Sequence, residues 1–151
     1  IALFGAKYFR NRNLAFLIPI VALWFSDVII NNFILSQYFE GFTFFYSGFY
    51  WQYGTFLLIT LIGRKTLNNF SFLKLLGVSI SSSLLFFIIS NFGVWASSSF
   101  YSKDIMGLIA CYTAAIPFYF GTLSGSVFYS FFLFGSYELL SKNTSKVFTN
   151  K

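Results

Sequence analysis

The sequence predicts an all-α membrane protein, a polytopic bundle of transmembrane helices that forms a single integral membrane domain over residues 1–151. Of its 151 residues, 57% are hydrophobic and 25% are aromatic, and the mean hydropathy is +0.72. Only 9% are charged, whereas a soluble domain typically carries about 25% charged residues. Too few charges remain to cover a water-facing surface. The apolar runs and the basic clusters between them predict about five crossings.

The first two apolar segments are Ile1–Phe9 and Asn13–Ile30. The first would rise only about 13 Å as a helix, so it is either the end of a span or a short span within a bundle. Because the chain begins inside an apolar run, we expect a further N-terminal helix before Ile1, which would make six. In the second segment, Pro19 predicts a kink. Asp27 either faces the bundle interior or lies among the lipid headgroups.

The third helix is predicted at about Phe45–Gly63, after a polar, glycine-containing loop at Asn31–Gly48. Tyr50 and Gln52 lie near its entry end, within a cluster of aromatic residues. This cluster is either an aromatic belt at the membrane interface or part of a ligand-binding wall.

Phe70–Asn91 is the clearest span of the sequence. Lys74, one turn into it, can extend back to the basic side that Arg64 and Lys65 mark. Small residues in the middle of the span favour tight helix contact; they are Gly77, Ser79 and Ser81–Ser83.

The segment Ile105–Leu140 is long enough for two spans, and the basic residues decide between one crossing and two. Cytoplasmic loops of membrane proteins are enriched in Lys and Arg, which requires an odd number of crossings between Lys103 and Lys142. We therefore expect a partial, re-entrant helix on the outer side at about 105–116, followed by one crossing at about Phe118–Leu140. This topology places the following residues in the cytoplasm: Lys7, Arg10, Arg12, Arg64, Lys65, Lys74, Lys142, Lys146 and Lys151.

The candidate ligand-binding residues lie toward the outer side of this topology. Asn91 either caps the end of its span or donates to a ligand. Trp95 and Tyr101 either stack on a flat ligand or anchor the chain among headgroups. Tyr112 carries a hydroxyl that needs a partner when buried, and Phe118 follows the proline at the top of the last helix. The candidate set is Tyr50, Gln52, Asn91, Trp95, Tyr101, Tyr112 and Phe118.

The composition leaves little for catalysis. The chain contains no histidine, four acidic residues and one cysteine, Cys111, so acid–base machinery is scarce and we expect neither an enzyme nor a catalytic, metal or cofactor site. Cys111 is predicted to be a small buried hydrophobe. Asp104 either pairs with Lys103 in solvent or caps the following helix. The net charge of +6 falls in clusters beside apolar runs, which predicts a membrane partner and no nucleic acid.

Several runs resemble a known class of transport proteins. The run GLIACYTAAIPFYFGTLSGSVFYSFFLFG (Gly107–Gly135) resembles the outer loop and last helix of the substrate-binding S components of energy-coupling-factor vitamin transporters. Ala2–Ile30 is similar to their second and third helices. The runs ALFGAKYF, SNFGVW and GLIACYTAAIPF also resemble a family of small bacterial membrane proteins described as candidate transport proteins. The resemblance implies six helices and a ligand pocket open to the outer side.

Two functions follow as expectations. The first is a component for binding and transport of a small, vitamin-like molecule in a bacterial inner membrane, which would capture its ligand from the outer side. Its C-terminal tail would be cytoplasmic, and an energy-coupling membrane subunit with ATPases would be its partner, because the chain has no ATPase motif. The alternative is a non-catalytic accessory or structural subunit of a larger membrane complex.

Overall fold

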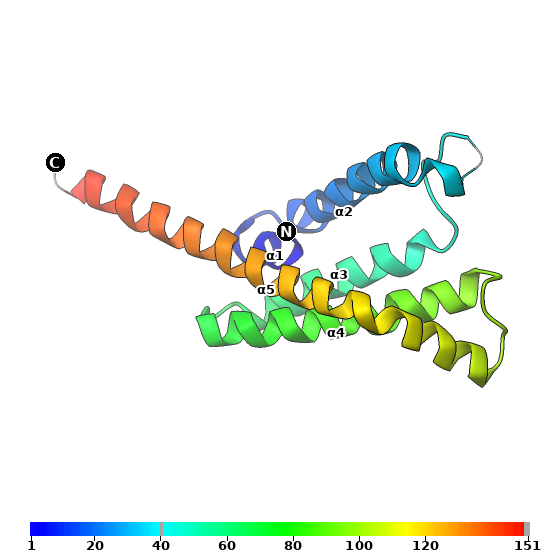
Figure 1. Ribbon diagram of the computed structural model, residues 1–151. Helices are drawn as coiled ribbons and strands as arrows, with labels where there is room; N and C mark the ends of the chain where they lie inside the picture. Colours follow the sequence, from blue (N-terminus) through cyan, green and yellow to red (C-terminus); the bar gives the residue numbers. More distant parts are fainter. Residues whose placement is uncertain (40, 150–151) are drawn as a thin grey trace.

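The structure is a computed structural model that describes residues 1–39 and 41–149, with side chains as far as Ser141. The described residues form helices and loops, which confirms the all-α prediction (Figure 1). The helices are α1 (Ala2–Tyr8), α2 (Arg12–Ile29), α3 (Phe49–Thr66), α4 (Phe72–Ser97) and α5 (Ile105–Thr149). A π-helix at Ile30–Ile34 and a 3-10 helix at Ser36–Tyr38 follow α2. The expected loop before α3 therefore begins with two short helical turns.

Three of the described helical segments are long and apolar enough to cross a membrane: Arg12–Ile34, Phe72–Ser97 and Ile105–Ser141. The chain is therefore a membrane protein in a lipid bilayer. The expected count of about five crossings is met only in part by these three segments. α1, with 7 residues, is too short to span, and α3, with 18 residues, is not among the three.

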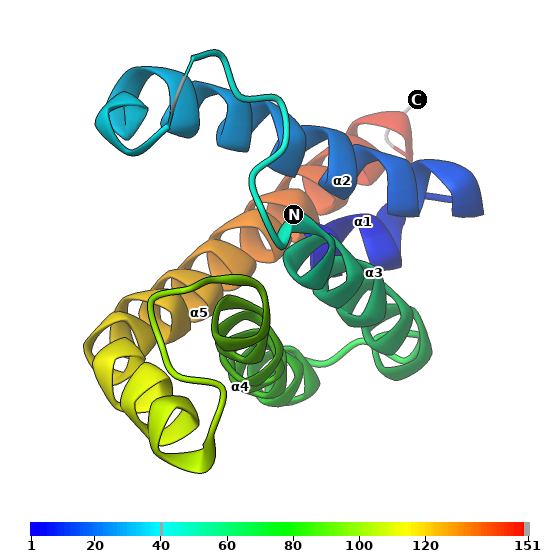
Figure 2. The same ribbon diagram turned by 90° about the vertical axis from the view of Figure 1, so that its right-hand side faces the viewer.

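α3, α4 and α5 pack side by side, and α1 lies against both α3 and α5. α2 packs on α1 and α3 and lies apart from α4, as two perpendicular views show (Figures 1 and 2). Phe134 of α5 is fully buried, and its ring stacks on Phe70 with centroids 5.4 Å apart. Phe4 and Tyr8 of α1 also contact this ring. Aromatic packing thus joins α1 and the α3–α4 loop to α5.

Basic side chains gather at one end of the bundle. The ammonium groups of Lys7 and Lys74 donate to the backbone carbonyls of Asn68 and Asn69 in the α3–α4 loop, each at 3.0 Å. The last turn of α3 adds Arg64 and Lys65 to the same end.

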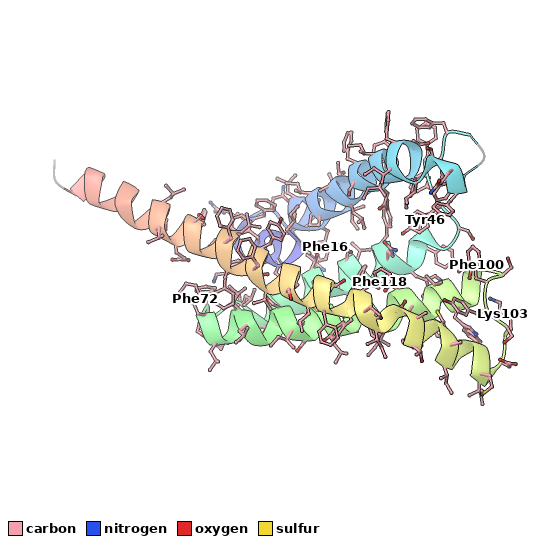
Figure 3. All side chains as sticks on the ribbon, in the orientation of Figure 1. Phe16, Tyr46, Phe72, Phe100, Lys103 and Phe118 are labelled. Atoms are coloured by element: carbon pink, nitrogen blue, oxygen red, sulfur yellow. The ribbon has the colours of Figure 1, made fainter. Side chains whose placement is uncertain are left out.

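Lys103 lies at the opposite end of the bundle from Phe72, the first residue of α4 (Figure 3). Lys7, Arg64, Lys65 and Lys74, which the sequence predicts to share one side, therefore lie at one end of the bundle, and Lys103 lies at the other. The tail residues Lys142, Lys146 and Lys151 lie outside the side chains that the structure describes.

The expected partial helix at 105–116 is wrong as a separate element. It forms the first part of α5, a continuous helix of 45 residues that contains Pro117. A proline in a helix removes one backbone hydrogen bond and kinks the helix without having to end it, and Pro19 lies inside α2 in the same way. At about 1.5 Å per residue α5 is about 67 Å long, so its C-terminal part extends beyond the other helices (Figure 1).

One helix end differs from the prediction, and a second is fixed by a cap. α4 continues to Ser97, so Asn91 lies within the helix and caps nothing; its amide donates to the carbonyl of Phe87 at 2.7 Å. α2 is capped by Asn11, whose side chain accepts from the backbone N–H of Asn13 at 2.9 Å. The bond of Asn91 shows how a polar residue can continue a span, because its side chain bonds to the backbone one turn earlier in the same helix.

Candidate functional site

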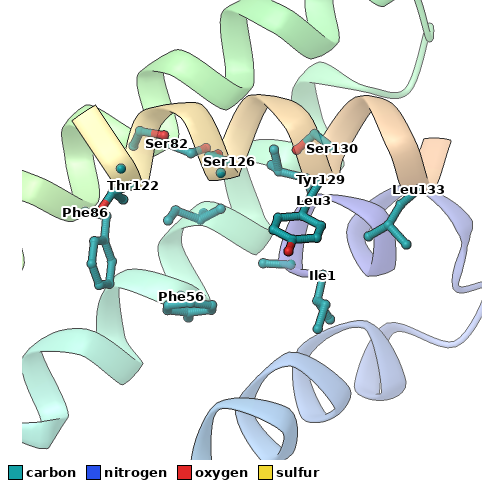
Figure 4. A pocket seen from close by; sticks show the side chains of 15 residues that line it. Ile1, Leu3, Phe56, Ser82, Phe86, Thr122, Ser126, Tyr129, Ser130 and Leu133 are labelled. Atoms are coloured by element: carbon teal, nitrogen blue, oxygen red, sulfur yellow. The ribbon is translucent and has the colours of Figure 1, made fainter. Parts of the chain in front are cut away.

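A cavity of about 540 Å³ lies between α1, α3, α4 and α5, at the middle of the long helices (Figure 4). This size is in the range of small-molecule sites, about 300–1,000 Å³. Its lining consists mainly of small hydroxyl-bearing, glycine and aromatic residues: Ile1, Ala2, Leu3, Phe56, Ile59, Ser82, Ser83, Phe86, Gly121, Thr122, Gly125, Ser126, Tyr129, Ser130 and Leu133.

Small residues on α5 create this space. Gly121 and Gly125 are one helical turn apart, so they lie on the same face of α5. A Cβ atom at either position would meet no heavy atom within 4 Å. Thr122, Ser126 and Ser130 follow at the same spacing beside them. This stretch of α5 is therefore only partly covered by the neighbouring helices: Gly121 and Thr122 are exposed, whereas Ser126 is half-buried.

The hydroxyl groups of the cavity differ in how they are satisfied. Ser83 donates to the carbonyl of Ser79 at 2.9 Å, and Thr122 donates to Phe118 at 3.2 Å. Ser126 of α5 reaches the same Ser79 carbonyl at 3.4 Å, which joins α5 to α4. Ser82, 4% exposed, has a buried hydroxyl without a hydrogen-bond partner. Of the small residues of α4 for which tight helix contact was predicted, Ser79 contacts α5 and Ser82 and Ser83 line the cavity, whereas Gly77 and Ser81 are exposed.

Aromatic rings form another part of the wall. Phe56 of α3 and Phe86 of α4 meet edge to face, with ring centroids 5.8 Å apart. Tyr129 of α5 lines the cavity and is 62% exposed, so the cavity reaches the outer surface of α5 at this ring. No Asp, Glu, Lys or Arg side chain is among the lining residues that the structure describes. The arrangement suits binding of an uncharged, partly apolar molecule; it offers no acid–base pair.

The candidate residues that we expected from the sequence lie elsewhere. Tyr50 contacts Ser97 through their hydroxyls at 3.3 Å, and Tyr112 donates to the carbonyl of Ile88 at 2.6 Å. Gln52 is half-buried on α3, and Phe118 is 77% exposed on α5. None of these lines the central cavity. Tyr112 instead lines a smaller hollow of about 340 Å³, with Phe87, Leu108, Ile109, Thr113 and Ile116.

Trp95 holds the loop between α4 and α5. Its indole N–H donates to the carbonyl of Ser102 at 2.9 Å, and the ammonium of Lys103 lies 5.7 Å from its ring centroid and donates to its carbonyl. Tyr101, half-buried, belongs to the same loop. The aromatic residues at this end of α4 and α5 therefore fasten a helical hairpin, and the structure does not bring the candidate set together around one space.

Asp104 caps α5, which confirms one of the two readings of this residue. Its carboxylate accepts the backbone N–H of Gly107 at 2.7 Å and the hydroxyl of Ser102 at 2.8 Å. These two hydrogen bonds, that of Gly107 first, hold the pKa of Asp104 below its ordinary value.

Asp27 faces α3, in agreement with the reading that it points toward the bundle interior. The hydroxyl of Tyr53 donates to its Oδ2 at 3.0 Å. In the adjoining loop, burial raises the pKa of Tyr46, and the nearby Asp27 carboxylate raises it further. Cys111 is buried, and its thiol contacts the carbonyl of Asn91 at 3.4 Å. No group of three metal-ligating side chains occurs among the residues that the structure describes.

Sequence reasoning missed the residues that line the cavity. Their signal was present in two runs, the serines of α4 and GTLSGS in α5, which are small and polar in the middle of apolar spans. Such residues are equally typical of close helix packing. Only the three-dimensional arrangement shows that part of this small-residue surface stays uncovered.

No curated protein and no solved structure matches the chain. A family profile matches it over residues 1–148, nearly its whole length. The chain therefore belongs to a family of unknown function, DUF6580.

Proposed function

We propose that this protein is the ligand-binding component of a transport system for a small, vitamin-like molecule in a bacterial inner membrane. The observation that carries the proposal is the central cavity. It lies at the middle of α3, α4 and α5, where a bound molecule would be halfway across the bilayer. The space is open on the α5 side, where Gly121, Thr122 and Tyr129 are exposed, and its volume is in the range of small-molecule sites.

The charge distribution supports an orientation for this component. The basic end, with Lys7, Arg64 and Lys74, would face the cytoplasm, and Lys103 would lie on the outer side, from which the ligand would enter. Because α5 is one helix, it crosses once, and its tail would be cytoplasmic. Four crossings, by α2 to α5, with α1 as a half-helix, agree with this arrangement.

The proposal assigns the energy source to a partner. The sequence carries no phosphate-binding loop, so transport would be downhill or would depend on an energy-coupling membrane subunit and its ATPases. The resemblance of Gly107–Gly135 to S components favours the second arrangement. The ligand would bind in the cavity, and the component would then reorient in the bilayer.

The proposal can be tested with a variant that fills the cavity with a side chain placed at Gly125, where there is room for one. Gly125→Phe directs a ring into the cavity, whereas Gly77→Phe places the same ring on an exposed part of α4; a Cβ atom meets nothing within 4 Å at either glycine. Native mass spectrometry of the purified proteins would measure retained small molecules, and thermal shift with a vitamin panel would measure added ones. We expect wild type and Gly77→Phe to bind and Gly125→Phe to lose binding. Equal binding by all three would exclude the cavity as the site.

A second candidate function rests on the position of α2. This helix lies apart from α4, and its side chains Leu17, Phe25 and Ile29 are 54%, 57% and 53% exposed. An accessory subunit would cover such a face with a helix of a partner protein. Stoichiometric co-purification of one membrane protein, with no small molecule retained by wild type, would favour this alternative.

A further inference from the structure

We propose that the basic end of the bundle binds the phosphate group of an anionic phospholipid, which the ammonium groups of Lys7 and Lys74 hold between them. The two lysines are far apart in the sequence and belong to different helices, α1 and α4. The fold brings both to the α3–α4 loop, where they donate to the carbonyls of Asn68 and Asn69. Neither lysine lines the central cavity, so this site does not depend on the proposed function.

The two ammonium groups lie close to each other. Each donates over 3.0 Å, and the two accepting carbonyls belong to consecutive residues. Because a single peptide unit separates these carbonyls, the two nitrogens are within about 12 Å of one another. An ammonium group has three N–H donors, and both hydrogen bonds are exposed. Each lysine therefore keeps donors for a phosphate oxygen placed between them.

Positive charge gathers at this loop without an acidic partner. Arg64 and Lys65, in the last turn of α3, add two charges beside it. Glu138 of α5 accepts the hydroxyl of Tyr8 at 2.6 Å, and it forms no ion pair with a basic side chain that the structure describes. Like charges repel one another, so an anion that contacts several of these groups would stabilise the arrangement.

The surroundings favour a lipid over a free anion. Phe72 and Leu73, the first residues of α4, directly precede Lys74 and are exposed. They begin a helix that is long and apolar enough to cross the membrane, so lipid tails would cover them. A phospholipid with its phosphate at the lysines would lay its acyl chains along this apolar surface. Basic clusters at the ends of membrane helices attract anionic lipids in this way.

Native mass spectrometry of the full-length protein would measure which lipids stay bound. The probes are two lipids with the same palmitoyl and oleoyl chains, anionic phosphatidylglycerol and zwitterionic phosphatidylcholine, added in equal amounts to the protein in detergent micelles. Each lysine near a membrane surface contributes about fivefold to the binding of anionic lipid. We therefore expect wild type to retain phosphatidylglycerol about tenfold or more over phosphatidylcholine.

Variants of the two lysines locate the site. Lys7→Gln combined with Lys74→Gln should abolish the preference, because glutamine can still donate to the loop but carries no charge. Lys7→Arg combined with Lys74→Arg should keep it. Lys103→Gln removes one charge at the opposite end of the bundle (Figure 3) and should also keep it. Should the double glutamine variant fail to fold, each single glutamine variant should lower the preference about fivefold.

Four results would overturn the proposal. Equal retention of the two lipids by wild type would exclude an anionic-lipid site, and an equal loss in Lys103→Gln would show that the overall charge attracts the lipid. Displacement of phosphatidylglycerol by inorganic phosphate at equal concentration would assign the lysines to a free anion. A protein that co-purifies with wild type and not with the double glutamine variant, without a lipid preference, would assign them to an acidic protein partner. None of these variants changes a residue that lines the cavity, so the proposed function is tested separately.

Discussion

The ring of Trp51 in α3 lies directly over the backbone of Gly93 in α4. A Cβ atom at position 93 would stand 2.5 Å from Cγ of Trp51, which is closer than two carbon atoms can approach without bonding. The indole N–H of Trp51 donates to the hydroxyl of Ser97 at 3.2 Å, one turn further along α4. The N-terminal part of α3 and the C-terminal part of α4 are therefore held together at a point where only glycine fits.

Gly93→Ala should destabilise the protein, because the added methyl group displaces Trp51 and breaks its bond to Ser97. Overpacking of this kind costs about 1–3 kcal/mol. Gly77→Ala is the matched control: a Cβ atom there meets nothing within 4 Å, and alanine favours a helix by up to about 1 kcal/mol over glycine. Thermal unfolding in one detergent should give opposite shifts for the two variants. Shifts of the same sign and size would contradict the packing.

Tyr8→Phe should also destabilise the protein. The Tyr8 hydroxyl donates to Oε1 of Glu138 at 2.6 Å and joins α1 to α5. Its removal leaves a partly buried carboxylate with one donor fewer, which costs about 1–3 kcal/mol. Tyr137→Phe keeps the ring that contacts Tyr8 at a centroid distance of 4.0 Å and should have a smaller effect. Unfolding midpoints of the two variants would measure the difference, and equal losses would show that the Tyr8 bond contributes nothing of its own.

Asp104 should make stability depend on pH in the acid range. Its pKa in the folded protein is below the ordinary value of 3.8 because the N–H of Gly107 and the hydroxyl of Ser102 donate to it. The carboxylate therefore stabilises the fold fully above that ordinary value, and this stabilisation is lost as the pH falls through the lowered pKa. Asparagine caps helices without titrating.

Unfolding midpoints of wild type and Asp104→Asn should accordingly converge as the pH is lowered from neutral to about 3, a range that includes the ordinary carboxyl pKa. Comparison of the two proteins removes the contribution of the other acids. A constant difference between them across this range would show that the carboxylate of Asp104 does not stabilise α5.

The sequence predicts the helices of this protein well because apolar runs and polar breaks are local features. Phe70–Asn91 was expected and Phe72–Ser97 is observed. The prediction failed where a polar residue or a proline did not end a helix. Asn91 bonds back to Phe87, and Pro117 removes only one bond from α5. Both outcomes depend on neighbouring backbone atoms, which the residue type alone does not reveal.

The site was less predictable than the fold. Asn91, Trp95 and Tyr112 were candidates for ligand contact, with helix capping as the alternative for Asn91 and headgroup anchoring as the alternative for Trp95. In the structure, backbone carbonyls of the same helical hairpin accept all three. For Ser82 the outcome is reversed. The sequence predicted a role in helix packing, whereas in the structure its hydroxyl has no hydrogen-bond partner and the residue lines the cavity. Whether a polar atom is free is a property of the packed helices.

The orientation of the bundle can be tested at its two ends. Asn68 lies in the loop that accepts Lys7, and Phe100, 87% exposed, lies in the opposite loop (Figure 3). Because basic residues favour the cytoplasm, a membrane-impermeant maleimide on intact cells should label Phe100→Cys and should label Asn68→Cys only after permeabilisation. Both variants need a Cys111→Ala background, which serves as the blank. The reverse pattern would invert the orientation, and labelling of both sites from outside would show that the loops do not face opposite sides.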